Sequence, residues 1–375
     1  MKYLKKRKPE WPNGLLFLAA YFHTLCSILY FLLSKYVIHD FDAIGYYLTT
    51  LEGMEGIAKT AFGTSTVSYI LLPLINYLSC SYFFSFILFG FLGFLGVLFF
   101  YSSLRSLLKE TPYMAYLPFI LFIPGIHFWS SAPGKDSMFM FATGLLLFSL
   151  LRFEKRWILS FLALTCMAMF RPHIAFFAFV SLMGALLWDG RIPLWVKTFF
   201  CALAALVLAR SLAYIVGIAG VALNAFSIEK FFLFFEMRQN QFYAGGSTLD
   251  ITQYPLPLKL FTYLCRPLFF DADSLIMFLA SCENVIYVGM LASFFSPRFF
   301  SFLFSKKSLF SRFNLYYFVL MIFVLGLTTS NLGLSTRQKL MVIPSFISLF
   351  FVYKKWCFQT YKVVLKTDVQ EKGPS

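Results

Sequence analysis

The residues best suited to chemistry begin with two carboxylates, Asp40 and Asp42, which directly follow the first long apolar run of the chain, 15–37. Carboxylates two residues apart, just above a bilayer, can act as a general base or hold a divalent cation. They can equally end a helix and solvate a loop, because a short Asp-x-Asp pattern often arises by chance. We take both as candidate catalytic residues, with a divalent metal at this pair left open and no metal ligands assigned.

Polar side chains in the turns further along the chain, all but one of them basic, are candidates for substrate binding. This set comprises Lys135, Asp136, Arg171, His173, Arg238, Arg266, Arg337 and Lys339. Cationic groups hold phosphate, and the Arg, Gln, Asn and Tyr side chains of segment 218–273 suit the hydroxyls of a sugar. Each turn also has a simpler interpretation, as a helix cap or a snorkelling cation. A base combined with cations suits group transfer from a phosphate-activated donor.

The apolar runs 157–170 and 174–188 meet at Arg171-Pro172-His173. Both runs are shorter than the ~20 residues that cross a bilayer. The turn between them should therefore be recessed, facing a water-filled cavity rather than lipid. We expect Lys135 and Asp136, which could pair with each other, to share one sunken cavity with this turn.

The composition places these groups on membrane helices. Of the 375 residues, 59% are hydrophobic, 13% are charged and 51 are Phe, whereas a soluble domain is roughly 45–50% apolar. The sequence therefore predicts an all-α polytopic membrane protein with about ten transmembrane helices. The expected spans are 15–37, 83–101, 113–128, 137–151, 157–170, 174–188, 195–217, 274–296, 314–328 and 340–353.

Basic residues fall mainly in the short connectors, which the positive-inside rule places in the cytoplasm. Both termini are then cytoplasmic, and the segment 67–80 is interfacial or re-entrant rather than a span. This arrangement gives one transmembrane domain, 1–355, with outer loops at 38–66 and 218–273 that contain helices, and a tail, 356–375, whose end is disordered. The net charge of +15 is explained by these connectors, so we assign no nucleic-acid partner.

Two charges inside the predicted spans, Arg210 and Glu283, are expected to pair with each other, because unpaired charges in a bilayer are costly. His23 is interpreted as a packed polar residue. The seven cysteines form no Cys-x-x-Cys pair and are read as small apolar residues, although one disulfide between Cys80 and Cys265 remains open.

A first span followed at once by an acidic motif, here HDFDAIGYY, resembles the GT-C superfamily of multi-span glycosyltransferases. The order FWSSAPGKDS, FRPH and SNLGLSTRQK is similar to that in membrane proteins of bacterial polysaccharide and O-antigen assembly. The resemblance covers most of the chain by topology and a few residues by motif. It implies that Asp40 or Asp42 serves as a base or metal ligand and that the donor is a polyprenyl-phosphate-linked sugar.

The expected protein is thus a glycosyltransferase of the bacterial inner membrane, which moves a sugar from a polyprenyl-phosphate donor to a glycan, lipid or protein acceptor on the periplasmic face. A Wzy-type polysaccharide polymerase or ligase is the first alternative, and it would need outer arginines rather than carboxylates. A multi-span transporter or lipid flippase is the second alternative, and it would need polar residues near the middle of the bilayer.

Overall fold

The computed structural model describes residues 13–37, 42–57, 63–190, 192–203, 249, 251 and 253–371, and the regular elements of this part of the chain are helices. The α-helices are α1 (Asn13–Tyr36), α2 (Asp42–Leu51), α3 (Thr64–Asn76), α4 (Tyr82–Leu108), α5 (Leu117–Leu121), α6 (Pro124–Ser130), α7 (Lys135–Leu150), α8 (Phe153–Phe170), α9 (Pro172–Leu187), α12 (Leu256–Cys265), α13 (Leu275–Ala292), α14 (Pro297–Phe304), α15 (Leu309–Thr328), α16 (Leu332–Gln338) and α17 (Ile343–Glu371). Short 3-10 helices are η1 (Pro112–Tyr116), η3 (Phe269–Asp271), η4 (Ser293–Phe295) and η5 (Lys339–Met341). The predicted all-α class is confirmed.

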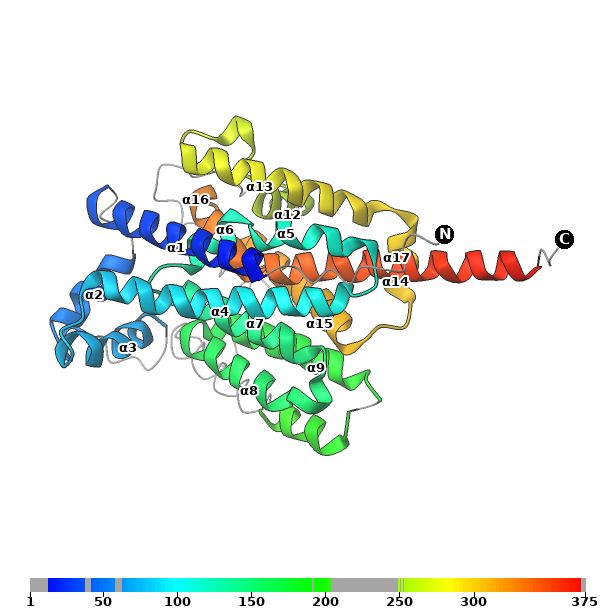
Figure 1. Cartoon of the computed structure of the whole chain (residues 1–375), viewed down its shortest axis with the longest axis horizontal. Coiled ribbons are helices and arrows are strands. Elements are labelled where there is room, and N and C mark those ends of the chain that lie inside the picture. The colour runs from blue at the N-terminus through cyan, green and yellow to red at the C-terminus, as the bar shows by residue number, and fades with distance from the viewer. Residues whose placement is uncertain are drawn as a thin grey trace.

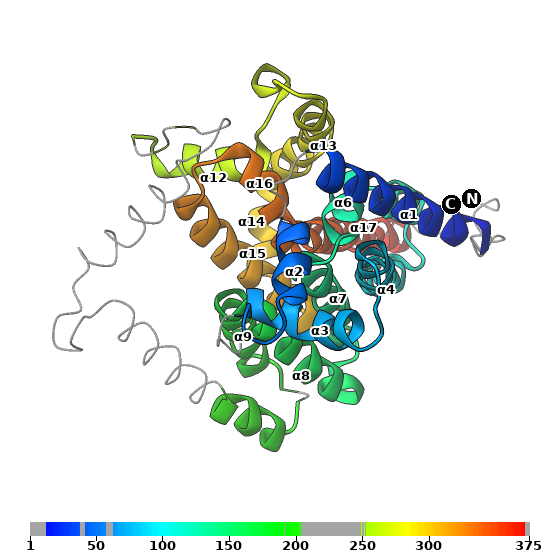
Figure 2. The ribbon, with the colours of Figure 1, turned by 90° about the vertical axis from the view of Figure 1, so that its left-hand side faces the viewer.

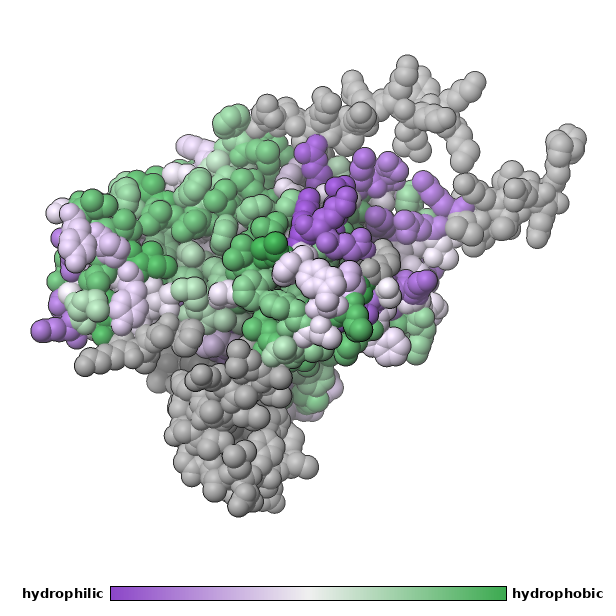
Figure 3. Space-filling view, turned by 90° about the horizontal axis from the view of Figure 1, so that it is seen from below, coloured by the Kyte–Doolittle hydropathy of each residue, from purple (hydrophilic) through white to green (hydrophobic). Residues whose placement is uncertain are grey.

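The long helices run along one axis, and α4 and α7 pack against each other near the middle of the bundle (Figure 1). Helices α2, α3 and α16 lie at one end, here called the α2 end, while α14 and the last turns of α17 lie at the other. Figure 2 looks onto the α2 end, where α2 crosses the centre among α16, α7 and α3. Seen from below, a broad hydrophobic band covers the middle of the molecule, and hydrophilic side chains gather toward the C-terminal end (Figure 3).

Four helices of the described chain are long and apolar enough to cross a membrane. They are Gly14–Tyr36, Tyr82–Leu108, Leu275–Phe295 and Leu309–Thr328. Two bent pairs raise the number to six if each pair is one span: Pro112–Leu121 with Pro124–Ser130, bent by 42°, and Leu332–Met341 with Ile343–Lys362, bent by 59°. These helices indicate a multi-pass membrane protein.

The prediction of ten spans is wrong. Helices α7 and α9 have 16 residues each, which at ~1.5 Å per residue reach about 24 Å, short of the ~30 Å of hydrocarbon. Helix α8 begins with charged residues and has non-helical backbone angles at Arg156. Of the expected span 195–217, only its start lies in a described helix, Leu194–Leu203. Helix α17 continues to Glu371, so the end of the tail, which was expected to be disordered, is helical up to that residue.

Glycine allows α4 and α7 to touch through their backbones. A Cβ at Gly144 of α7 would lie 2.1 Å from the carbonyl oxygen of Gly96 on α4, and a Cβ at Gly96 would lie 2.4 Å from the carbonyl oxygen of Met140. Small residues at such crossings are what membrane helices use to approach closely. Gly96 and Gly144 therefore allow α7 to pack in direct backbone contact with α4.

We expect Gly144→Ala to lower the free energy of unfolding by about 2 kcal/mol, because a backbone must move to admit the methyl group. Thermal unfolding in detergent measures this change. Gly289→Ala on α13 is the matched control, since no atom lies within 4 Å of the added Cβ, and it should be neutral or slightly stabilising. Equal stability of the two variants would contradict the assigned α4–α7 contact.

Polar contacts in the interior fasten helices to one another. His23 of α1 and His127 of α6 are buried, and their Nδ1 atoms are 3.0 Å apart, so the packed polar role predicted for His23 fits. Glu283 of α13 accepts a hydrogen bond from the backbone N–H of Gly125, at 2.8 Å, and another from the hydroxyl of Tyr287. The expected partner of Glu283, Arg210, lies outside the described residues. Both carboxylate oxygens are occupied without it.

The disulfide left open between Cys80 and Cys265 is not formed, because both residues are free thiols. Cys265 is buried at the end of α12, and Cys80 lies in the turn before α4. Cys265 belongs to the hydrophobic core, which fits the interpretation as a small core residue.

Candidate functional site

Asp136 is the centre of an ion network at the α2 end. It lies in the first turn of α7, after the helix-breaking pair Pro133-Gly134, where the helix dipole favours an acidic side chain. One carboxylate oxygen accepts a hydrogen bond from Arg171, and the other accepts one from Nε of Arg337 at 2.5 Å. The Asp136 side chain is only 7% exposed. A buried carboxylate held by two guanidinium groups stays ionised and fixes both of them in place.

Arg171 owes its position to the proline that follows it. Proline disfavours helical backbone angles in the preceding residue, and Arg171 accordingly ends α8 and precedes α9 with φ −145° and ψ 74°. This break turns the guanidinium toward Asp136. Its Nε is buried and has no hydrogen-bond partner within the described structure, so the group keeps one unused donor.

Arg337 comes from α16, a short helix that starts at a capping residue. The Asn331 side chain accepts a hydrogen bond from the N–H of Leu334 at 2.9 Å, as expected for asparagine at a helix start. Thr329 donates to Gln338 across the same turn, at 2.7 Å. These contacts hold α16 at its 59° bend from the following helix and point Arg337 inward.

Asp42 is the first residue of α2, and its carboxylate is 2.7 Å from Nη1 of Arg337. Arg337 thus lies between two acids and contacts Asp136 through Nε and Asp42 through Nη1. The two acids differ in environment, since the Asp42 side chain is 46% exposed. Asp40, the other candidate catalytic acid, lies outside the described residues.

Lys135 completes what we call the Asp136 cluster: Asp42, Lys135, Asp136, Arg171 and Arg337. Its ammonium donates to the hydroxyl of Thr64 at 3.3 Å and lies within electrostatic range of the other four members. The pairing of Lys135 with Asp136 that the sequence left open is not among the ion pairs of the described residues, where Asp136 contacts the two arginines. His173 is exposed at the second residue of α9.

Arg266 and Lys339 form a separate group. Nε of Arg266 donates to Asp271 at 2.9 Å, and the ammonium of Lys339 donates to the carbonyl oxygen of Arg266 and to Asn284, each at 2.6 Å. The hydrogen bond to Asp271 raises the pKa of Arg266 above its usual range. Burial favours a raised pKa for Asp271, but the hydrogen bonds from Arg266 and from the N–H of Leu268 lower it overall. These cations have protein partners and tie the turn after α12 to α13. Arg238, the remaining candidate, lies outside the described residues.

Two tyrosines near the Asp136 cluster were not predicted from the sequence. Tyr30 of α1 and Tyr46 of α2 are buried and lie within electrostatic range of Asp42, Asp136 and Arg337. Each sits in a run rich in aromatic residues, so its type alone carries no signal. Packing alone brings Tyr46 to the start of α7, where its ring lies 3.5 Å from a Cβ added at Gly134, and the sequence gives no signal of this contact.

Of the two carboxylates left open as a metal site, only Asp42 belongs to the described residues. No group of three or more His, Cys, Asp or Glu side chains gathers within the described ranges. Asp42 contributes one carboxylate, and that carboxylate is paired with Arg337.

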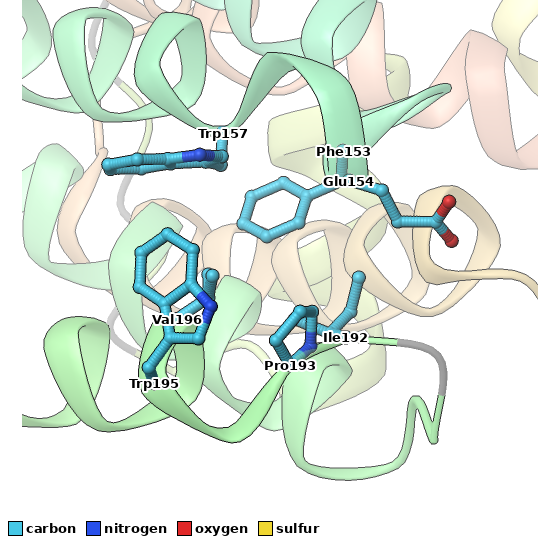
Figure 4. Close-up of a pocket in the computed structure, with 7 residues that line it drawn as sticks. All are labelled: Phe153, Glu154, Trp157, Ile192, Pro193, Trp195 and Val196. Carbon is cyan, nitrogen blue, oxygen red and sulfur yellow. The ribbon is translucent and has the colours of Figure 1, made fainter.

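A cavity of about 210 Å³ lies away from this cluster, where α8 begins. It is lined by Phe153, Glu154, Trp157, Ile192, Pro193, Trp195 and Val196. Figure 4 shows the rings of Trp157 and Trp195 facing the space, while the Glu154 carboxylate points away from them. Tryptophan is typical of membrane–water interfaces, and no candidate site residue lines this cavity.

The Asp136 cluster thus combines one exposed carboxylate with three cations, carried by α2, by the start of α7, by the α8–α9 junction and by α16. Such a set can take a proton at the carboxylate and stabilise an anion at the cations. No family model, curated protein or solved structure matches this chain.

Proposed function

We propose that this protein is a membrane glycosyltransferase that uses a polyprenyl-phosphate-linked sugar and works at the α2 end. The observation that supports this proposal is the meeting of Asp42, Asp136, Arg171 and Arg337, which are up to 295 positions apart in the sequence, in one ion network. In this proposal the α2 end faces the periplasm and the chain lies in a bacterial inner membrane. The acceptor is a glycan, a lipid or a protein.

The chemistry needs a base and an anion site. The acceptor hydroxyl attacks the anomeric carbon of the sugar, its oxygen–carbon bond forms, and the bond from that carbon to the phosphate oxygen breaks. Asp42 takes the hydroxyl proton, since it is the exposed carboxylate of the cluster. Arg337, Arg171 and Lys135 stabilise the charge that develops on the departing polyprenyl phosphate. Asp136 holds the two arginines in position and does not touch the substrate.

Asp42→Asn tests the assigned base. Sugar transfer should fall by about 10²–10⁴-fold, which is what general-base catalysis contributes, while expression and folding stay normal because the side chain is half exposed. Transfer of radiolabelled sugar from a polyprenyl-phosphate donor in membrane vesicles measures this. Asp273→Asn, an exposed carboxylate outside the cluster, is the control. Full activity of Asp42→Asn would remove Asp42 as the base.

A Wzy-type polysaccharide polymerase is the second candidate, and one observation favours it. The most buried part of the cluster is the arginine–Asp136–arginine bridge, and a polymerase of this type would depend on arginines without an essential carboxylate at Asp42. Loss of activity in Arg171 and Arg337 variants, combined with a fully active Asp42→Asn, would select this candidate over the first.

A further inference from the structure

The two acids beside Arg337 hold it in unequal ways. Asp136 accepts from Nε at 2.5 Å and is 7% exposed, whereas Asp42 lies 2.7 Å from Nη1 and is 46% exposed. Exposed ion pairs contribute little because water screens them and side-chain freedom opposes them. The contact with Asp136 is therefore the fixed one, and the contact with Asp42 is the one that a competing anion can replace.

Asp42 contacts Arg337 on the more exposed side of the arginine, where a ligand would arrive. The Arg337 side chain is only 18% exposed, and it also contacts the buried Asp136, so the nitrogen that faces the half-exposed Asp42 is the one on the more exposed side. A phosphate carries several acceptor oxygens and can engage two guanidinium nitrogens at once. A phosphate bound there would compete with the Asp42 carboxylate for Nη1 of Arg337.

We propose that Asp42 is an internal competitor of the substrate phosphate, which neutralises Arg337 at rest and is displaced when a phosphate-bearing ligand binds. Displacement frees the Asp42 carboxylate, so the base becomes available only when the donor is in place. While it contacts Arg337, the Asp42 carboxylate is already engaged by a protein partner. This inference rests on the proposed function for the identity of the ligand, and it adds how the site is regulated.

The test is a binding experiment on the full-length protein in detergent, with farnesyl phosphate as a soluble prenyl phosphate probe and isothermal titration calorimetry as the readout. Asp42→Asn should bind the probe about tenfold more tightly than the wild type, the equivalent of about 1.4 kcal/mol. Arg337→Gln should abolish binding. Asp273→Asn makes the same change in net charge away from the cluster, and it should bind as the wild type does.

The competition and the proposed function fail in different ways. An Asp42→Asn variant that binds the probe no more tightly than Asp273→Asn overturns the competition, even if its sugar transfer is lost. Absence of binding by the wild type and by every variant overturns it as well. Tighter binding by Asp42→Asn, combined with a wild-type protein that transfers no sugar, supports the competition and contradicts the proposed function.

Discussion

Asp136→Ala should destabilise the protein more than any other single substitution in the cluster, by about 3–5 kcal/mol. The change leaves the guanidinium groups of Arg171 and Arg337 close together with no carboxylate between them. Their side chains are 12% and 18% exposed, so water can compensate only in part. Thermal unfolding in detergent should show a loss of folded protein at temperatures where the wild type is intact.

A combined variant separates the stability of this bridge from its function. Asp136→Leu together with Arg171→Met and Arg337→Met replaces all three charged groups with apolar side chains, an exchange that is often neutral or stabilising. We expect this triple variant to regain most of the stability lost in Asp136→Ala and to have no transferase activity. An Asp136→Ala protein as stable as the wild type would contradict the buried bridge.

Arg337→Lys should reduce sugar transfer by about 10²–10³-fold, the loss typical when a donor that stabilises transition-state charge is removed. Arg337 uses Nε toward Asp136 and Nη1 toward Asp42 at the same time. A lysine keeps the charge but has a single nitrogen, so it cannot hold Asp136 and meet a phosphate in a fixed geometry at the same time. Expression should be nearly normal because the buried charge of Asp136 keeps a cationic neighbour in Arg171.

The control for this substitution is Arg298→Lys, an exposed arginine in α14, away from the α2 end. It makes the same chemical change without touching the cluster and should leave transfer unchanged. Wild-type activity of Arg337→Lys in the same vesicle assay would show that Arg337 acts only as a positive charge. The proposal that it contacts two groups through separate nitrogens would then be wrong.

Part of this site follows from local rules that are visible in the sequence. Pro172 forces a helix break at Arg171, and Asn331 caps the start of the helix that carries Arg337. Pro133-Gly134 directly precedes the helix whose first turn contains Asp136. Each rule acts over a few residues, so the sequence predicts that these polar turns exist and that they lie between apolar helices. The all-α class follows equally directly from the apolar composition.

The pairing of these groups depends on how helices far apart in the sequence pack. The sequence could not distinguish a Lys135–Asp136 pair from the observed Asp136–Arg337 contact, because the latter requires α7 and α16 to meet across 201 positions. The separate role of Lys339 was equally hidden, since only packing brings it to Asn284 and to the turn at Arg266. The predicted number of spans was wrong for a related reason. In the sequence, an apolar run that is buried inside the bundle has the same pattern as a span that faces lipid.

The most direct test of the central claim is a deletion of the gene in its native host, with lipid-linked sugar intermediates and surface glycans measured by mass spectrometry. Complementation would use the wild type, Asp42→Asn and Arg337→Lys, each at matched expression. We expect the deletion strain to lose one sugar or to make a shorter glycan while a polyprenyl-phosphate-linked sugar accumulates, and we expect only the wild type to restore the profile. An unchanged glycan and lipid profile in the deletion strain would contradict the account.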